Sequence, residues 1–158
     1  MSSPVDVKIS IRAWSDSVSL KPLAKRLGAR TNTVYDKGEL TYSGRVTGRT
    51  SSDNYLSTED IEIVGVVDLN RMIRAQLALI DADATLSSLT RASDGRVYLW
   101  VAVFGNDPRE TETLGIDTRP FGHGIGLIVD NFTTYNEKGQ SSVFEIGPRG
   151  GRLLQPAK

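Results

Sequence analysis

The stretch that decides the fold is RVYLWVAVF, residues 96–104. β-Branched and aromatic residues dominate this run, and apolar side chains fall on both of the faces that alternate along an extended chain. A strand that is apolar on both faces is typical of the interior of a sheet. We therefore predict a central strand over 96–104 and expect Trp100 to be buried in it.

Outward from this run, the sequence predicts further strands. Residues 5–14 alternate apolar and polar with period two, which indicates a strand with one buried face. The polar residues 51–60 are expected to form a loop. The remaining predicted strands, each based on β-prone residues, are 61–67, 125–135, 142–146 and part of 40–50.

Two amphipathic helices are predicted as well. Apolar residues recur at helical spacing over 18–28, where Gly28 is a suitable C-terminal residue. A second apolar stripe runs over 68–80 behind the N-capping residue Asp68. Residues 82–92 favour a further short helix.

Together these elements predict a single α+β domain, a mixed or antiparallel sheet with two or three helices packed on one face. We assign residues 1–146 to this domain. The glycine-containing residues 147–158 are predicted to form a flexible C-terminal tail.

Composition narrows the function classes. The 158 residues include no cysteine, which excludes disulfides and thiolate metal sites. No secretory signal pattern opens the sequence, and no apolar run is long enough to cross a membrane, so we expect a cytoplasmic protein without membrane contact. The 19 basic and 19 acidic residues balance, which argues against a dedicated binder of phosphate backbones.

The charges do not balance along the chain. Residues 1–50 hold nine basic and four acidic side chains, whereas residues 51–158 hold ten and fifteen. Either the two parts neutralise each other in the folded domain, or the acidic part binds a basic partner. We expect such a surface in the loop after the central strand, because rigid strands often hold binding loops. The partner-binding residues predicted there are Asp107, Arg109, Glu110, Glu112 and Asp117.

An alternative site is the segment 21–37, which has the spacing of a helix-turn-helix. Gly28 would form the turn, and a recognition helix would begin near Thr31. Against this interpretation, Gly38 follows within two turns, and a strand comes directly before the motif. The residues that would contact nucleic acid are Lys21, Lys25, Arg26, Arg30 and Asn32.

No catalytic constellation is apparent. His123 is the single histidine, and no Gly-x-Ser-x-Gly nucleophile motif is present. The sequence GHGIG at 122–126 precedes a predicted strand, whereas a dinucleotide-binding loop follows a strand and opens a helix. Acidic residues do not cluster at metal-ligand spacing. We therefore expect no enzyme activity, no metal and no cofactor.

Several of these features, taken in order, resemble a bacterial family catalogued as domain of unknown function 4279, over about residues 5–135. The similar features are the first strand, the helix ending in Leu27-Gly28, the Lys37-Gly38-Glu39 turn, the leucine-rich helix and the Trp-bearing strand. The sequence departs from the family in two places. The Trp that the family has soon after the Lys-Gly turn has no counterpart, and residues 118–126 stand where the family has a helix.

The resemblance implies a compact sheet with helices on one face and, by analogy, an immunity or accessory protein that acts by binding. We therefore predict a non-catalytic protein-binding module that covers the active surface of a partner, such as a basic toxin or another effector. A nucleic-acid-binding regulator is the first alternative, and a small-ligand-binding domain is the second.

Overall fold

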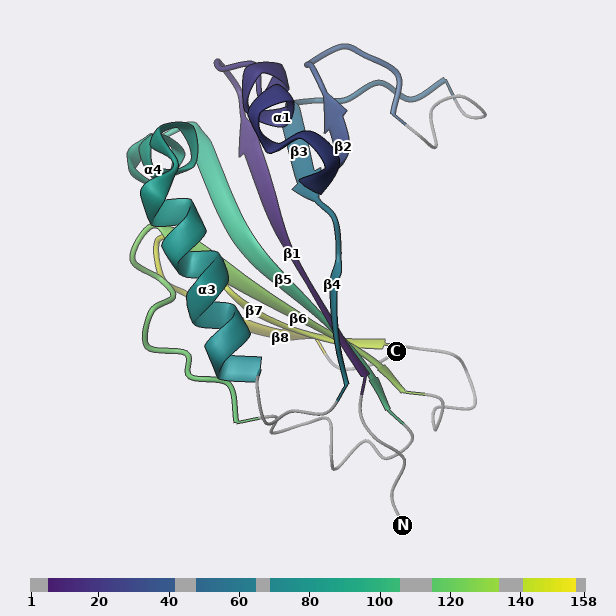
Figure 1. Ribbon diagram of the computed structural model, residues 1–158, viewed down its shortest axis with the longest axis vertical. Coiled ribbons are helices and arrows are strands. Elements are labelled where there is room, and N and C mark those ends of the chain that lie inside the picture. Colours follow the sequence, from purple (N-terminus) through teal and green to yellow (C-terminus); the bar gives the residue numbers. More distant parts are fainter. Residues whose placement is uncertain (1–5, 42–47, 65–68, 106–114, 134–140, 156–158) are drawn as a thin grey trace.

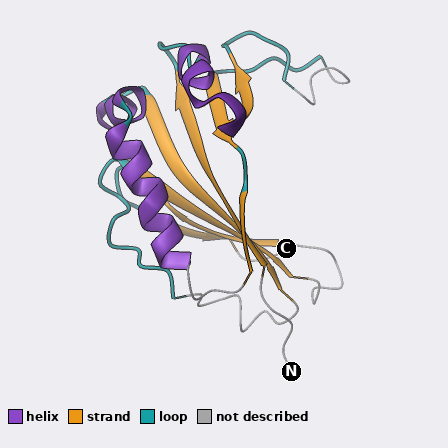
Figure 2. Cartoon of the chain, in the orientation of Figure 1, coloured by secondary structure: helices purple, strands orange, loops and turns teal. Residues whose placement is uncertain are grey.

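The computed structural model describes residues 6–41, 48–64, 69–105, 115–133 and 141–155. These residues form one eight-stranded mixed sheet with three α-helices on one face (Figures 1 and 2). The strands are β1 (Asp6–Ser15), β2 (Thr31–Tyr35), β3 (Asn54–Thr58), β4 (Ile61–Val64), β5 (Gly95–Gly105), β6 (Ile125–Thr133), β7 (Ser141–Ile146) and β8 (Arg152–Gln155). The helices are α1 (Lys21–Leu27), the 3-10 helix η1 (Gly28–Arg30), α3 (Leu69–Ala82) and α4 (Ala84–Arg91).

The strand order is β2-β3-β1-β5-β6-β7-β8, and β4 also pairs with β1. Only the pairing of β5 with β6 is parallel among the described strand pairs. One edge of β1 pairs with β5 over its whole length. Its other edge pairs with β3 near Ser15 and with β4 near Asp6, so β3 and β4 act as one interrupted strand.

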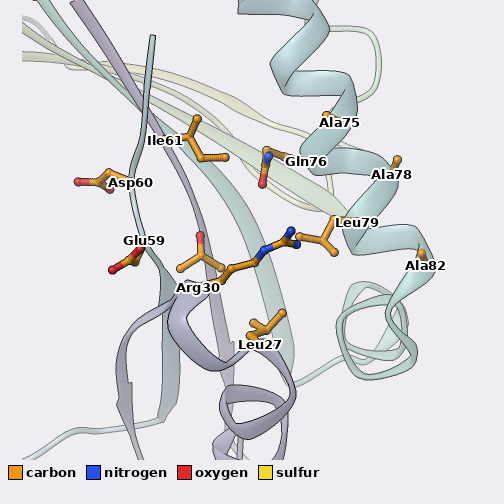
Figure 3. Close-up of a pocket in the computed structure, with 11 residues that line it drawn as sticks. Leu27, Arg30, Glu59, Asp60, Ile61, Ala75, Gln76, Ala78, Leu79 and Ala82 are labelled. Carbon is orange, nitrogen blue, oxygen red and sulfur yellow. The ribbon is translucent and has the colours of Figure 1, made fainter.

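At the interruption between β3 and β4, a side-chain oxygen takes the place of a backbone carbonyl as hydrogen-bond acceptor for β1. The buried Ile11 N–H donates to Thr58 Oγ1 at 2.9 Å. The N–H of Glu59 turns instead toward η1 and donates to the carbonyl of Arg30 at 2.7 Å. Figure 3 shows the Glu59 and Asp60 side chains pointing away from α3, whereas Ile61 points toward it.

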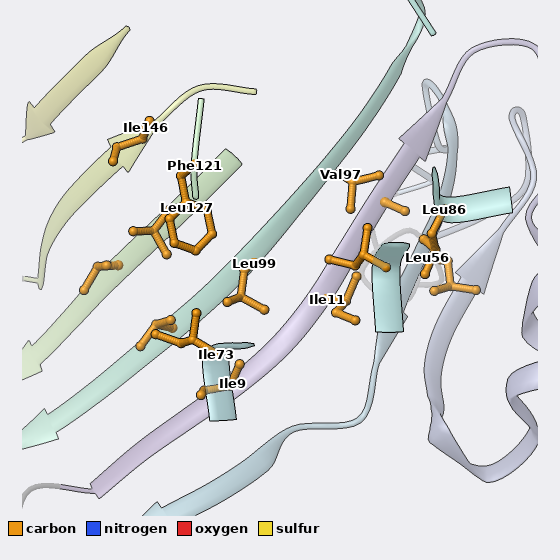
Figure 4. Close-up of a cluster of buried hydrophobic side chains, with 14 of the residues drawn as sticks. Ile9, Ile11, Leu56, Ile73, Leu86, Val97, Leu99, Phe121, Leu127 and Ile146 are labelled. Atoms are coloured by element: carbon orange, nitrogen blue, oxygen red, sulfur yellow. The ribbon is translucent and has the colours of Figure 1, made fainter. Parts of the chain in front are cut away.

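The hydrophobic core lies between the sheet and the helices (Figure 4). Side chains alternate across a strand, so every second residue of each central strand faces the helical layer. All of the residues that line this layer from the two central strands are fully buried. They are Val7, Ile9, Ile11 and Ala13 of β1, and Val97, Leu99, Val101 and Val103 of β5. The helices contribute Leu23, Leu69, Ile73, Ile80, Leu86 and Leu89.

The connection from β5 to β6 returns on the helical side of the sheet. Its described part, residues 115–124, runs beside α3 toward the start of β6 (Figure 1). The Asn70 side chain holds it by donating to the Gly115 carbonyl at 2.7 Å and accepting from the Asp117 N–H at 2.9 Å. Phe121 from this connection enters the core and is 4% exposed. The glycine-rich sequence at 122–126 therefore ends a structural crossover.

The predicted α+β architecture, with a mixed sheet and helices on one face, is confirmed. The predicted strand at 96–104 is β5, which lies between β1 and β6. Among the described helices, none combines the length and apolar content that a membrane span requires.

Three segments differ in secondary structure from the sequence analysis. Residues 54–58 form β3 rather than a loop, because their polar side chains are buried and hydrogen-bonded. Asn54, for example, is 8% exposed and accepts from the Lys37 N–H. The described part of 40–50 holds an isolated bridge between Leu40 and Thr50 instead of a strand. Residues 152–155, placed in a tail by the sequence analysis, form β8 and pair with β7.

The helix predicted over 18–28 begins later, at Lys21. The preceding residues form a turn closed by Ser15, whose buried Oγ accepts from the Val18 N–H at 2.9 Å. Leu20 is fully buried at the end of that turn. Leu20 therefore packs in the core although it lies before the first residue of the helix.

One glycine is required by a close approach between strands. Tyr98 of β5 lies beside Gly126 of β6, and a Cβ added to Gly126 would lie 2.4 Å from Tyr98 Cε1 and 2.9 Å from the Ile146 carbonyl oxygen. The missing side chain lets the Tyr98 ring cross β6, so that its hydroxyl reaches Glu145 of β7 at 3.1 Å.

We expect Gly126→Ala to lower the free energy of unfolding by about 1–3 kcal/mol, because the added methyl group overpacks this crossing. Urea denaturation would measure the loss. Adding Tyr98→Ala to Gly126→Ala should remove part of the clash, so the double variant should lose less than the sum of the two single losses. A Gly126→Ala protein as stable as the original would contradict this account.

Candidate functional site

The sheet has a second face, opposite the helices, that carries aromatic and basic side chains. Alternation along the strands turns these residues away from the core. The described helices all lie on the other face (Figure 1). We call this surface the open face and define it by Lys8, Ser10, Arg12, Trp14, Tyr35, Tyr55, Arg96, Tyr98, Trp100 and Phe104.

A row of aromatic rings crosses one end of the open face. Tyr35 stacks on Tyr55 with a centroid distance of 6.4 Å, and Tyr55 lies 5.2 Å from Trp14. Tyr98 meets Trp14 edge-on at 5.6 Å. Cross-strand pairing places these rings side by side, because Tyr35 is opposite Tyr55 and Tyr55 is opposite Trp14.

Arg96 continues the row on β5. Its guanidinium lies 5.4 Å from the Trp14 ring centroid and 3.4 Å from a carboxylate oxygen of Asp53. Next to this row is a hollow of about 300 Å³. Its walls combine the three rings of Trp14, Tyr35 and Tyr55 with hydroxyl groups from residues 50–52. The hollow can therefore receive a side chain that offers both apolar and hydrogen-bonding surface.

The centre of the open face holds an arginine stacked on a tryptophan. The Arg12 guanidinium carbon lies 4.0 Å from the centroid of Trp100. Within the described part of the chain, Arg12 Nε is buried without a hydrogen-bond partner, and so is Ser10 Oγ. Ser10 is 2% exposed and lies directly opposite Trp100 across the β1–β5 pair.

Trp100 thus lies elsewhere than the sequence analysis predicted. It is half-buried on the open face and does not enter the core. The run 96–104 is apolar on both faces, but only the face of Val97, Leu99, Val101 and Val103 packs against the helices. The aromatic half of the run is partly accessible to a partner.

A groove of about 610 Å³ is the second candidate site (Figure 3). It lies between α3 and the interruption that separates β3 from β4. In Figure 3 the Arg30 side chain reaches across the groove toward Leu79, and Gln76 points into it from α3. The other walls are mainly apolar and include Leu27, Ile61, Ala75, Ala78 and Ala82.

The structure does not bring the predicted acidic loop together as a site. Asp107, Arg109, Glu110 and Glu112 lie outside the described residues. Asp117 lies beside α3 on the helical side, and both of its carboxylate oxygens are bonded by Arg119, at 2.9 and 2.8 Å. These bonds lower the pKa of Asp117 to about 2. Its charge is already neutralised within the chain.

The helix-turn-helix alternative is wrong in its geometry. Residues 31–35 form β2 and pair with β3, because Thr31, Thr33 and Val34 fit an edge strand better than a helix. Lys21 forms ion pairs with Asp36 and Glu39, and Arg26 pairs with Asp83. Lys25 and Asn32 are exposed, and Arg30 lies at the groove.

The open-face residues were missed, although the sequence contains a signal for those on β1. The period-two pattern at 5–14 that predicts a buried face also assigns Ser10, Arg12 and Trp14 to the opposite face. Nothing in the sequence shows that the described helices all pack on the other side.

Comparisons of the chain with family models, with curated proteins and with solved structures gave no match. The resemblance to the domain of unknown function therefore stays a prediction, and the geometry of the sites has to carry the functional argument.

The Tyr98 hydroxyl tests the contact that crosses β6, because it bonds Glu145 of β7. Burial, together with the hydrogen bond to Glu145, raises the pKa of Tyr98 to about 12. Because the folded pKa lies above the unfolded value near 10, this stabilising contribution is complete below pH 10 and is lost as the pH rises toward 12.

We expect the tyrosine absorbance titration of the folded protein to contain a step near pH 12 that Tyr98→Phe removes. The same variant should show a shallower loss of stability between pH 10 and 12. If Tyr98→Phe leaves the alkaline titration unchanged, the hydroxyl is not held as described.

Proposed function

We propose that this chain is a non-catalytic module that binds another protein through the open face of its sheet. The supporting observation is the composition of that face: two tryptophans, three tyrosines, a phenylalanine and two arginines on a surface with no described helix over it. Trp, Tyr and Arg are the residues most enriched among those that dominate protein–protein binding energy.

The geometry of these residues also suits a docking surface. The aromatic row is held rigid by cross-strand contacts, so little conformational entropy is lost when a partner covers it. Phe104, which is 38% exposed, supplies apolar area at the far end of the face, with Lys8 over its ring. The rings would provide contact area, and the polar groups between them would set orientation.

Charge favours a protein over a nucleic acid at this face. Stacking platforms for single strands combine aromatic rings with a basic groove that follows the phosphates. Here, two of the three cations that define the face are paired with carboxylates, Lys8 with Glu62 and Arg96 with Asp53. The more specific hypothesis, an immunity protein that neutralises a basic effector through the acidic loop, stays a prediction.

A photo-crosslinking amino acid tests which face meets the partner. Placed at Tyr55 or Phe104, it should capture one protein in the source cells, whereas the same group at Ala78 or Arg91 on the helical side should not. After that protein is purified, Trp14→Ala and Tyr55→Ala should each raise the dissociation constant, by about 30-fold if the residues are binding hot spots.

Arg91→Ala, on the exposed side of α4, is the matched control and should leave the affinity unchanged. Melting temperatures of all variants would separate lost binding from lost folding. Crosslinks from the helical positions alone would refute the proposal.

The groove supports a second candidate function, binding of a small amphiphile. Its volume of about 610 Å³ falls within the usual range of ligand pockets. Its apolar walls suit a hydrocarbon body. The donors that point into it, Arg30 and Gln76, suit an anionic head group placed on the α3 side, since the lining carboxylates Glu59 and Asp60 point away from that helix.

Dodecanoate tests this second function directly. We expect it to bind more tightly than dodecanol, and we expect Arg30→Gln to abolish that difference, as measured by calorimetry. Ala78→Trp should fill the groove and weaken both ligands, while Lys25→Gln on the neighbouring helix should change neither. Equal binding of the acid and the alcohol to the original protein would show that Arg30 does not bind the head group.

A further inference from the structure

We propose that Arg12, held on Trp100 and next to Ser10, is a receptor for a single carboxylate side chain, Asp or Glu, of the protein partner. This inference rests on the proposed function, since it names the chemistry that the open face recognises. It assigns a partner group to a part of the sheet that contains polar atoms without partners.

The Arg12 side chain is held by a ring and not by any described carboxylate. Its guanidinium lies 4.0 Å from the Trp100 centroid, a distance at which the planar cation is held against the ring. Within the described residues no hydrogen bond or ion pair joins the Arg12 side chain to another group. Its position is therefore set by stacking, while its donors stay available for two parallel bonds to a carboxylate.

Two buried polar atoms in this described part of the open face have no hydrogen-bond partner. In the described part of the chain, Arg12 Nε and Ser10 Oγ are both buried without a partner. Buried polar atoms are nearly always hydrogen-bonded, because leaving one unpaired is costly. Ser10 and Arg12 are two positions apart on β1 and so project from the same face. Because both atoms are buried, a partner's carboxylate would bond the terminal Nη atoms of Arg12, and the two buried atoms would add polarity beside it.

The charges around Arg12 favour a single carboxylate over a chain of phosphates. Among the cations that define the open face, Arg12 alone lacks a carboxylate partner within the described residues. The surrounding acidic groups, Glu62, Asp53, Glu145 and Asp130, would repel a polyanion more strongly than a single carboxylate. A site with one unpaired cation, bounded by rings and carboxylates, fits a single acidic side chain flanked by apolar ones.

This chemistry differs from the acidic-loop hypothesis. There, carboxylates of this chain would meet a basic partner, whereas at the open face an arginine of this chain meets an acidic group. Of the acidic-loop residues, Asp117 is described, and it lies on the helical side, whereas Arg12 is on the other face.

A random peptide library displayed on phage, selected on the immobilised full-length chain, provides the test. The site that each selected peptide occupies is mapped by the Trp100 indole and Arg12 Nε–H signals in ¹⁵N spectra. We expect peptides that perturb both signals to contain an Asp or Glu beside an apolar residue. Replacing that residue by Asn or Gln should weaken binding at least about tenfold.

Arg12→Gln should cause a similar loss, and the two losses should not add when the peptide change and Arg12→Gln are combined. Arg12→Lys, which keeps the charge but loses the planar fork, should recover only part of the affinity. Arg91→Gln is the control and should have no effect. Melting temperatures within a few degrees of the original would show that the variants are folded.

Peptides that bind the open face equally well without an acidic residue would overturn this inference and leave the proposed function standing. Peptides that bind only elsewhere would count against both. A thymidine oligonucleotide that binds through Arg12 more tightly than the acidic peptides do would also overturn the inference, because it would identify a phosphate site.

Discussion

The antiparallel pairing of β1 with β5 over ten residue pairs is the interaction on which the rest of the structure depends. It aligns the alternating side chains of the two strands, so that one face of both is fully apolar and takes the helices. The other face receives the remaining residues of the same strands, including Arg12 and Trp100. A slip of one residue would exchange the two faces, so the same register that builds the core also assembles the candidate site.

The sequence predicted an element correctly where the pattern of one buried face was enough to determine it. The alternation at 5–14 and the apolar stripe of α3 each reflect a single buried face, and both elements formed where predicted. It failed where a tertiary partner decided, as at β3, whose buried Ser57 and Thr58 look like loop residues. The group that donates a hydrogen bond to Thr58, the Ile11 N–H, is 47 positions away in the sequence, and no local pattern contains that information.

The candidate site was hidden for a related reason. Tyr98 and Trp100 are large and apolar, and their sequence environment does not distinguish a helix-covered face from an uncovered one. What decides is the position of α3 and α4, which together with the β5–β6 connection take one side of the sheet. The groove at Arg30 was equally unpredictable, because three elements that are distant in sequence form it.

The strand order also determines when the chain can fold. β1 leaves the ribosome first among the described strands, but its longest ladder is with β5, roughly 85 residues later, and β6 can add only after the crossover from β5. Until then one edge of β1 lacks its hydrogen-bonding partner. Folding should therefore be late and highly cooperative, and fragments that end before β5 should be prone to aggregation, since an unpaired central strand is a template for other chains.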